Sequence, residues 1–131
     1  MQDLVMPYAC DDDSLKADSY VYRLTSVMME AGEKLGRRFD QTVRYEEMMR
    51  KAGFVDIQVV KFKWPLNTWP KDPYYKEIGA WMQLNTDQGI EAFVMALATR
   101  VLGWSQEEAL VFCAKVRKEL YDTRVHAYLS M

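Results

Sequence analysis

The sequence predicts one domain, residues 1–131, with a predominantly helical α+β fold of about five helices and a small sheet centred on residues 54 to 64. Two observations carry this prediction. Apolar residues recur at helical spacing over well over half of the chain. The alternation of apolar and polar residues that favours strands is confined to two or three short stretches.

The N-terminal third predicts a strand and a long helix. Residues 3 to 8 are typical of a short extended segment, which Pro7 ends. Ser14 is expected to cap a helix that runs to Leu35, and Gly36 is its stop. The apolar stripe of this helix consists of Val21, Leu24, Met28, Ala31 and Leu35.

The next segment predicts a short helix followed by the best strand of the sequence. The helix covers about residues 42 to 52, turns Tyr45, Met48 and Met49 inward and ends at Gly53. The strand covers residues 54 to 64. Its apolar alternation changes parity near Val59, which suggests a bulge or a twist there.

The C-terminal half begins with an elbow between two prolines, after which Asp72 and Pro73 start a helix. We expect this helix to break at residues 85 to 87 and a further helix to end at Gly103. Residues 105 to 108, Ser-Gln-Glu-Glu, form a capping box, with Trp104 placed to pack on Ala109. The last helix runs to about Tyr121, buries Cys113, and is followed by a strand over residues 125 to 129.

Composition excludes several classes of protein. Half of the residues are hydrophobic and 27% are charged, which is typical of a globular chain. The net charge is -2, and no basic block indicates binding to nucleic acid. Residues 1 to 13 lack the basic start and apolar run of a signal peptide, and no stretch approaches the roughly 20 apolar residues of a membrane span. We therefore expect a cytoplasmic protein that binds neither nucleic acid nor membrane.

No metal site is expected. His126 is the only histidine, and no spacing of carboxylates or cysteines supports it as a ligand. The acidic run at residues 11 to 13 lacks the glycine turn and the distal glutamate of a calcium loop. Its simplest interpretation is a solvated loop.

Aromatic residues around the elbow suggest a pocket for a flat organic molecule. The candidate polar partners are His126, Arg100 and Lys71, of which His126 is the candidate general base. Structural alternatives remain open, since the rings can simply form a core, His126 can be structural, and Arg100 can bond the last carbonyls of its helix. The candidate substrate-binding residues are Tyr22, Trp69, Tyr74, Trp81 and Trp104.

Six separated motifs keep the order they have in a known family. The sequence resembles the C-terminal half of fungal S-adenosylmethionine-dependent methyltransferases of class I, a group of enzymes and regulators of secondary metabolism. The resemblance implies a helical lid and much of the pocket for the methyl acceptor. The matching motifs are residues 32–37 (Gly-Glu-Lys-Leu-Gly-Arg), 49–56 (Met-Arg-Lys-Ala-Gly-Phe-Val-Asp), 69–73 (Trp-Pro-Lys-Asp-Pro), 76–79 (Lys-Glu-Ile-Gly), 99–105 (Thr-Arg-Val-Leu-Gly-Trp-Ser) and 126–128 (His-Ala-Tyr).

The cofactor half of that family has no counterpart in the sequence. By resemblance, the chain begins where the family's fifth strand finishes and stops short of the full last strand. The family holds S-adenosylmethionine with a glycine-rich loop, whereas no two of the six glycines here lie close enough to form one. We therefore expect no cofactor, and no methylation by this chain unaided.

Three classes of function remain. The preferred one is a cofactor-independent isomerase or cyclase of fungal secondary metabolism, acting on a polyketide- or terpenoid-like small molecule, because the pocket half is kept and the cofactor half is absent. The second is a non-catalytic or helper subunit that joins a separate methyltransferase chain. The third is a fragment with no activity of its own. Because the strand over residues 54 to 64 would lack covering partners, we also expect a homodimer or higher oligomer.

Overall fold

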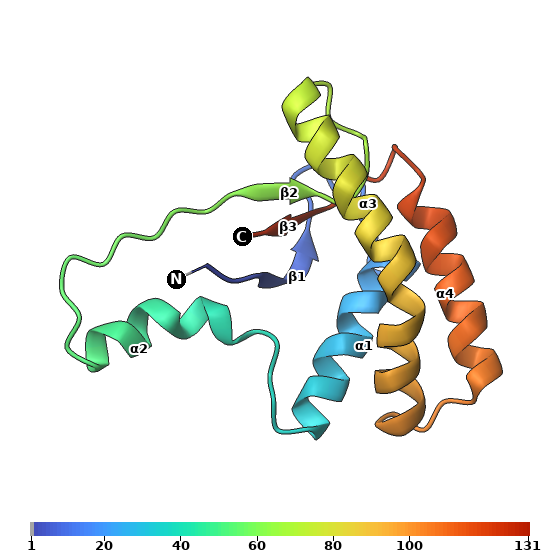
Figure 1. The fold of residues 1–131 in the computed structure, drawn as a ribbon, viewed down its shortest axis with the longest axis horizontal. Coiled ribbons are helices and arrows are strands. Elements are labelled where there is room, and N and C mark those ends of the chain that lie inside the picture. The colour runs from blue at the N-terminus through green and yellow to red at the C-terminus, as the bar shows by residue number, and fades with distance from the viewer. Residues whose placement is uncertain (1) are drawn as a thin grey trace.

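The computed structural model describes residues 2–131 and consists of a helical body, a small sheet and a projecting arm (Figure 1). The helical body contains α1, α3 and α4, with α4 packed against the other two. The elements are β1 (Val5–Ala9), α1 (Tyr20–Lys34), the 3-10 turn η1 (Gln41–Arg44), α2 (Tyr45–Lys51), β2 (Lys63–Pro65), α3 (Pro73–Val94), the π-helical turn η2 (Met95–Thr99), α4 (Gln106–Leu120) and β3 (Tyr128–Ser130).

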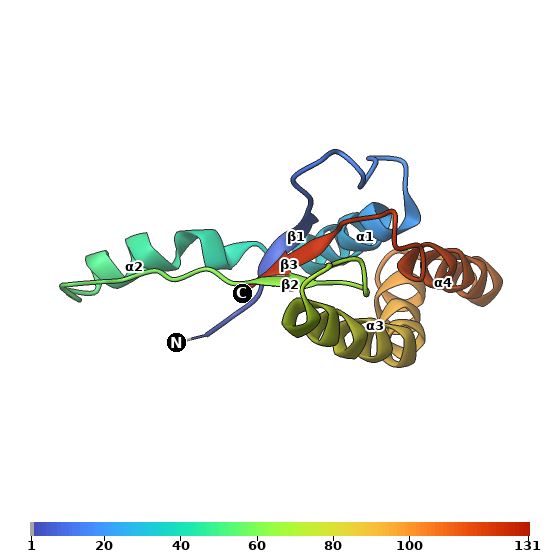
Figure 2. The ribbon, with the colours of Figure 1, turned by 90° about the horizontal axis from the view of Figure 1, so that it is seen from above.

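The sheet has the order β1-β3-β2, and both outer strands run antiparallel to β3. Lys63 lies opposite Ser130 and Pro65 opposite Tyr128, while the register of β1 shifts between Val5 and Ala9. Helix α1 packs beside β1 and α3 beside β2, so the strands lie between these helices (Figure 2). The prediction of a mostly helical α+β fold is confirmed.

The core lies between the helical body and the sheet. Because α1, α3 and α4 each carry apolar residues at helical spacing, their inward faces meet in one cluster. Cys113 is fully buried, as predicted. The buried members are Met6, Val21, Leu24, Val27, Leu66, Ile90, Val94, Ala98, Ala109, Phe112, Cys113, Val116, Leu120, Ala127 and Leu129.

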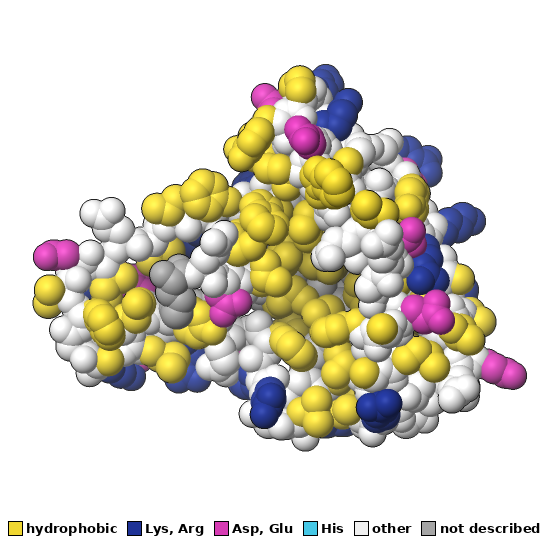
Figure 3. Space-filling model, in the orientation of Figure 1, with side chains coloured by type: hydrophobic (Ala, Val, Ile, Leu, Met, Phe, Trp, Pro, Cys, Tyr) yellow, Lys and Arg dark blue, Asp and Glu magenta, His cyan; other side chains and the backbone are white. Residues whose placement is uncertain are grey.

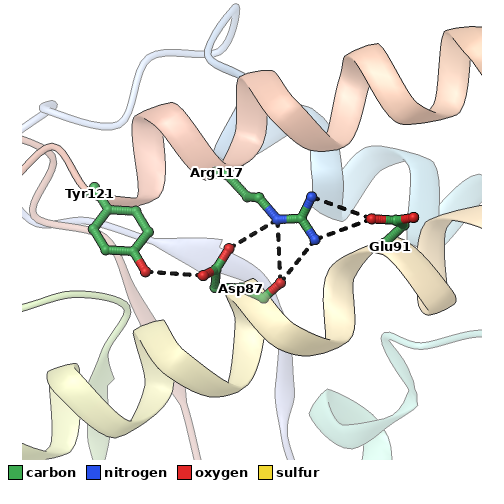
Figure 4. Close-up of polar contacts among 4 residues, drawn as sticks. All are labelled: Asp87, Glu91, Arg117 and Tyr121. Atoms are coloured by element: carbon green, nitrogen blue, oxygen red, sulfur yellow. Dashed lines mark hydrogen bonds and ion pairs between the residues drawn. The ribbon is translucent and has the colours of Figure 1, made fainter.

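A polar clamp joins α3 to α4 beside this core (Figure 4). The Arg117 guanidinium donates to the Asp87 carboxylate at 2.9 Å and to the Asp87 backbone carbonyl at 3.1 Å. It also reaches Glu91 at 3.4 Å, and the Tyr121 hydroxyl donates to the second oxygen of Asp87 at 3.0 Å. The clamp fixes the two helices at the point where α3 was predicted to break.

Two helix boundaries and one buried stripe differ from the prediction. Helix α1 begins at Tyr20 rather than after Ser14, because Ser19 is the cap and its hydroxyl accepts from the Tyr22 amide at 3.1 Å. Helix α3 continues through residues 85 to 87, where Asp87 is engaged by Arg117 instead of turning the backbone. The stripe of α1 buries Val27, while Leu35 is exposed. The capping box of Ser105 and Glu108 is confirmed.

The arm, residues 41–62, is the largest departure from the prediction (Figure 1). Helix α2 has no buried residue, so the expected inward packing of Tyr45, Met48 and Met49 is wrong. Of the predicted strand over residues 54 to 64, only Lys63 and Trp64 belong to β2, and Phe62 forms a reciprocal backbone pair with Met131. Residues 55 to 61 extend past β3, and in the described chain they make no backbone hydrogen bond to another strand.

None of the helices in the described part of the chain combines the length and apolar character that a membrane crossing requires.

Candidate functional site

The candidate site is a loop cluster formed by Asp12, Ser14, Trp69 and His126. The loop after β1 meets the residues that precede β3, because the two strands are antiparallel neighbours. The His126 ring Nδ1 contacts the Asp12 carboxylate. The backbone N–H of His126 donates to the Ser14 hydroxyl oxygen at 2.8 Å. The imidazole is therefore fixed through its ring and through its own backbone.

Asp12 is ionised throughout the physiological range. Hydrogen bonds from Ser14 and then from the His126 ring lower the pKa of the Asp12 carboxyl to about 2. A carboxylate at Nδ1 favours the tautomer that carries its proton there, and this leaves Nε2 as the nitrogen able to accept a proton from a ligand. The contact between His126 and Asp12 thus has the arrangement that a histidine general base requires.

Trp69 supplies an aromatic wall beside the imidazole. The two ring centroids are 4.9 Å apart at an interplanar angle of 34°. The Trp69 indole N–H donates to the Ala127 carbonyl at 3.1 Å, which ties the elbow to the residue after His126. Of the predicted residues, Trp69 and His126 are therefore brought together.

Asn67 holds the elbow in this position. Its side chain is 2% exposed, and its amide donates to the carbonyls of Asp122 and Val125 at 3.2 and 3.3 Å. Its carbonyl oxygen accepts from the Trp69 backbone N–H at 2.9 Å. All the hydrogen-bonding groups of this buried amide are thus directed toward keeping the elbow against residues 122 to 127.

The acidic loop is more than the solvated loop that the sequence suggested. Asp11 pairs with Lys63 on β2, and the Tyr128 hydroxyl on β3 donates to Asp11 at 2.8 Å. The Lys63 ammonium lies 4.5 Å from the centre of the Tyr128 ring. The hydrogen bond from Lys63 is the largest cause that lowers the pKa of Asp11. Asp11 and Asp12 therefore connect the loop to both neighbouring strands.

The other predicted residues lie elsewhere. Trp104 packs edge-on against Phe112, with centroids 5.3 Å apart, beside α1 and α4. Tyr74 and Trp81 are 68% and 65% exposed on α3. Tyr22 is half-buried on α1, and the exposed side chains of Lys71 and Arg100 make no hydrogen bond or ion pair within residues 2–131. The structure does not gather the predicted aromatic set into one pocket.

An apolar groove of about 720 Å³ lies along the arm. It runs between α2, the N-terminal residues and the extended segment 54–62, and Met131 closes one end. In the space-filling view, hydrophobic side chains lie along the arm, and others gather in the hollow between the arm and the helical body (Figure 3). Its exposed apolar residues include Val43, Phe54, Val55, Val59, Val60 and Phe62, of which Val55 is 81% exposed.

Comparison with known proteins identifies relatives among fungal proteins of secondary metabolism. The chain is 38% identical over 128 residues to "Probable methyltransferase tdiE" of Emericella nidulans, covering 98% of this chain and 40% of that protein. It is 39% identical over 127 residues to "Methyltransferase pytC" of Aspergillus terreus, covering 97% of this chain and 39% of that protein. It is 35% identical over 120 residues to "Secondary metabolism regulator LAE1" of Cochliobolus heterostrophus, covering 91% of this chain and 39% of that protein.

The chain thus spans about 40% of the length of the relatives it matches. No family model matches it, and no solved structure matches it significantly.

Proposed function

This chain is a relative of the fungal methyltransferases of secondary metabolism, and from that premise we propose that it acts as the acceptor side of such a methyltransferase, docked on a cofactor-binding part through the apolar groove. The observation that carries the proposal is the groove. Residues 57 to 61 present a backbone that pairs with no strand of the described chain, next to a row of exposed apolar side chains. Both features are stabilised when another polypeptide covers them.

The glycines of the described chain do not form a cradle for S-adenosylmethionine. The space beside Gly32 is filled by the Phe39 ring and the Arg37 carbonyl, and the space beside Gly79 by the Asn67 carbonyl. These close approaches serve the chain's own packing. We therefore assign the methyl donor to a separate cofactor-binding part. The remaining glycines, Gly36, Gly53, Gly89 and Gly103, face open space. Of these, Gly36, Gly53 and Gly103 follow helices and have positive φ.

The proposal is tested by reconstitution. The chain is co-expressed with the remainder of tdiE, the part it does not match, and the pair is examined by gel filtration and by titration with S-adenosylmethionine. We expect a complex that binds the methyl donor, while the chain alone gives no saturable heat. Val59→Asp places a charge in the groove and should abolish the complex. Leu110→Asp, on the exposed face of α4, is the matched control. If the wild-type pair forms no complex, the proposal is wrong.

A cofactor-independent isomerase or cyclase is the second candidate, and the loop cluster favours it. A half-exposed imidazole oriented by a carboxylate and flanked by an indole can move a proton on a flat, polyketide- or terpenoid-like molecule without a cofactor. In this case, turnover of such a molecule by the purified chain should fall roughly 100-fold or more in His126→Ala and about tenfold in Asp12→Asn. Arg100→Ala, remote from the cluster, should leave turnover unchanged. Equal activity of His126→Ala and the wild type would exclude this role.

A further inference from the structure

A second site lies on the helical body, in the notch lined by Tyr20, Arg23, Trp104, Glu108, Val111, Phe112 and Lys115. The notch has a volume of about 280 Å³ and is built from α1, α4 and the residue before the α4 cap. We propose that it binds a small organic carboxylate that carries a flat ring. The inference is independent of the methyltransferase role and of the loop cluster.

Two cations face the notch without an acidic partner. The Arg23 guanidinium lies 5.2 Å from the centre of the Tyr20 ring and 5.9 Å from that of Phe112. The Lys115 ammonium lies 4.9 Å from the same Tyr20 ring. Neither cation forms an ion pair with any residue in the described range 2–131. Two like charges beside one ring repel each other, and an anion between them would relieve that repulsion.

The notch also offers directed hydrogen-bond donors. Lys115 donates to the Tyr20 hydroxyl oxygen at 2.9 Å, so the proton of that hydroxyl is free to point at a ligand. The planar guanidinium of Arg23 matches the two oxygens of a carboxylate. Three different donors therefore converge on one small volume.

Glu108 lines the notch but is engaged elsewhere. Its carboxylate accepts from the Ser105 backbone N–H at 2.8 Å, as the second half of the capping box. That bond lowers the pKa of Glu108 and keeps it ionised. With one anion against two cations, the notch carries a net charge of one positive unit, which a single carboxylate neutralises.

The aromatic wall is fixed by the core. Phe112 is buried, and Tyr20 and Trp104 pack against the same core cluster. Phe112 meets Trp104 at an interplanar angle of 86° and Tyr20 at 62°, with centroids 5.3 and 6.0 Å apart. A ring bound here would contact rigid aromatic surface, so little ordering would be needed on binding.

The test is a titration of the purified chain with 2-naphthoate, followed by the indole N–H resonance of Trp104 in NMR spectra. That resonance is assigned with Trp104→Phe. We expect saturable shifts with a dissociation constant on the order of 1 mM. The neutral matched probe, 2-naphthalenemethanol, should bind at least about tenfold more weakly because it cannot use the cations. Inorganic phosphate, which has no ring, should produce no saturable shift of Trp104.

Variants then locate the binding. Arg23→Gln and Lys115→Gln should each weaken naphthoate binding about tenfold. Lys118→Gln removes a cation from the same helix outside the notch and should change nothing. Both positions in α4 are exposed, so folding is retained, as circular dichroism can verify. The proposal is overturned if naphthoate gives no saturable shift, if the alcohol or phosphate binds equally well, or if Lys118→Gln weakens binding as much as Lys115→Gln.

Discussion

Gly79 shows how one residue sets the distance between an element and a loop. An added Cβ would overlap the Asn67 carbonyl and lie 2.8 Å from its carbonyl carbon, so α3 can approach the elbow only with a glycine here. This residue belongs to the stretch 76–79, one of the motifs that carry the resemblance to the methyltransferase family. Gly79 thus allows the close packing of α3 on the backbone of Asn67, whose side chain accepts from the Trp69 N–H.

Substitution of Gly79 by alanine should therefore destabilise the chain. We expect Gly79→Ala to lower the free energy of unfolding by about 3 kcal/mol, because backbone rather than a flexible side chain must move. Gly89→Ala is the matched control, since nothing lies within 4 Å of its added Cβ. It should stabilise α3 by about 0.5–1 kcal/mol. Urea unfolding measures both, and equal effects would contradict the packing role.

The lowered pKa of Asp12 predicts that the stability of the folded chain falls at acid pH. Its pKa is about 2 in the folded chain against 3.8 ordinarily, so the folded state binds fewer protons there than the unfolded state. The contribution of Asp12 is present above pH 3.8 and is lost as the pH falls through about 2. Asp12→Asn should lower stability near neutral pH and flatten its decline over this range. Urea midpoints measured across that range test this, and an unchanged slope would contradict the contact with His126 and Ser14.

At the scale of elements, the sequence predicts some features well because their causes are local. The α4 cap depends on Ser105 and Glu108, which are three residues apart, and it is correct to the residue. The break expected at residues 85 to 87 is wrong, because the propensity of these residues is overridden by Arg117, which lies 30 residues away from Asp87. A local pattern cannot reveal such a partner.

The Arg117 clamp should contribute measurably to stability. Its guanidinium is about one-third exposed and satisfies a carboxylate and a backbone carbonyl together. We expect Arg117→Met to cost about 1–3 kcal/mol. Arg50→Met breaks an exposed pair with Glu46 inside α2 and should cost less than about 0.5 kcal/mol. Thermal unfolding compares the two, and equal losses would show that the clamp adds nothing beyond a surface pair.

At the scale of the whole molecule, the candidate site could be predicted only in part. His126 and Trp69 were identified from residue type and from the elbow. Asp12 was missed because it is 114 residues away in sequence, and its proximity depends on β1 pairing with β3. The aromatic set did not assemble because Tyr74 and Trp81 lie on the solvent side of α3. The number of aromatic residues suggests an aromatic surface, but the fold topology determines which aromatic side chains lie together.

The groove also predicts self-association when no other chain covers it. Burying several hundred Å² of apolar surface at about 25 cal/mol per Å² contributes on the order of 10 kcal/mol before the costs of association. We therefore expect a symmetric dimer by light scattering at about 10 µM, with twice the 15.4 kDa mass of one chain. Val59→Asp should shift it to the monomer, and Leu110→Asp should not. A wild-type monomer at this concentration would contradict the prediction.

The arm has a consequence for how the chain opens. No residue between 41 and 62 belongs to the core cluster. Helix α2 has two ion pairs within its own turns, Arg50 with Glu46 and Lys51 with Glu47, and an exposed hydrogen bond from Tyr45 to Asp3. The amides of the arm should therefore exchange with deuterium through local fluctuations. The amides of α1, α3 and α4 should exchange only when the whole chain unfolds. A protease should nick the arm first. The two fragments would then stay together as one folded particle, because all residues of the core cluster lie outside the arm.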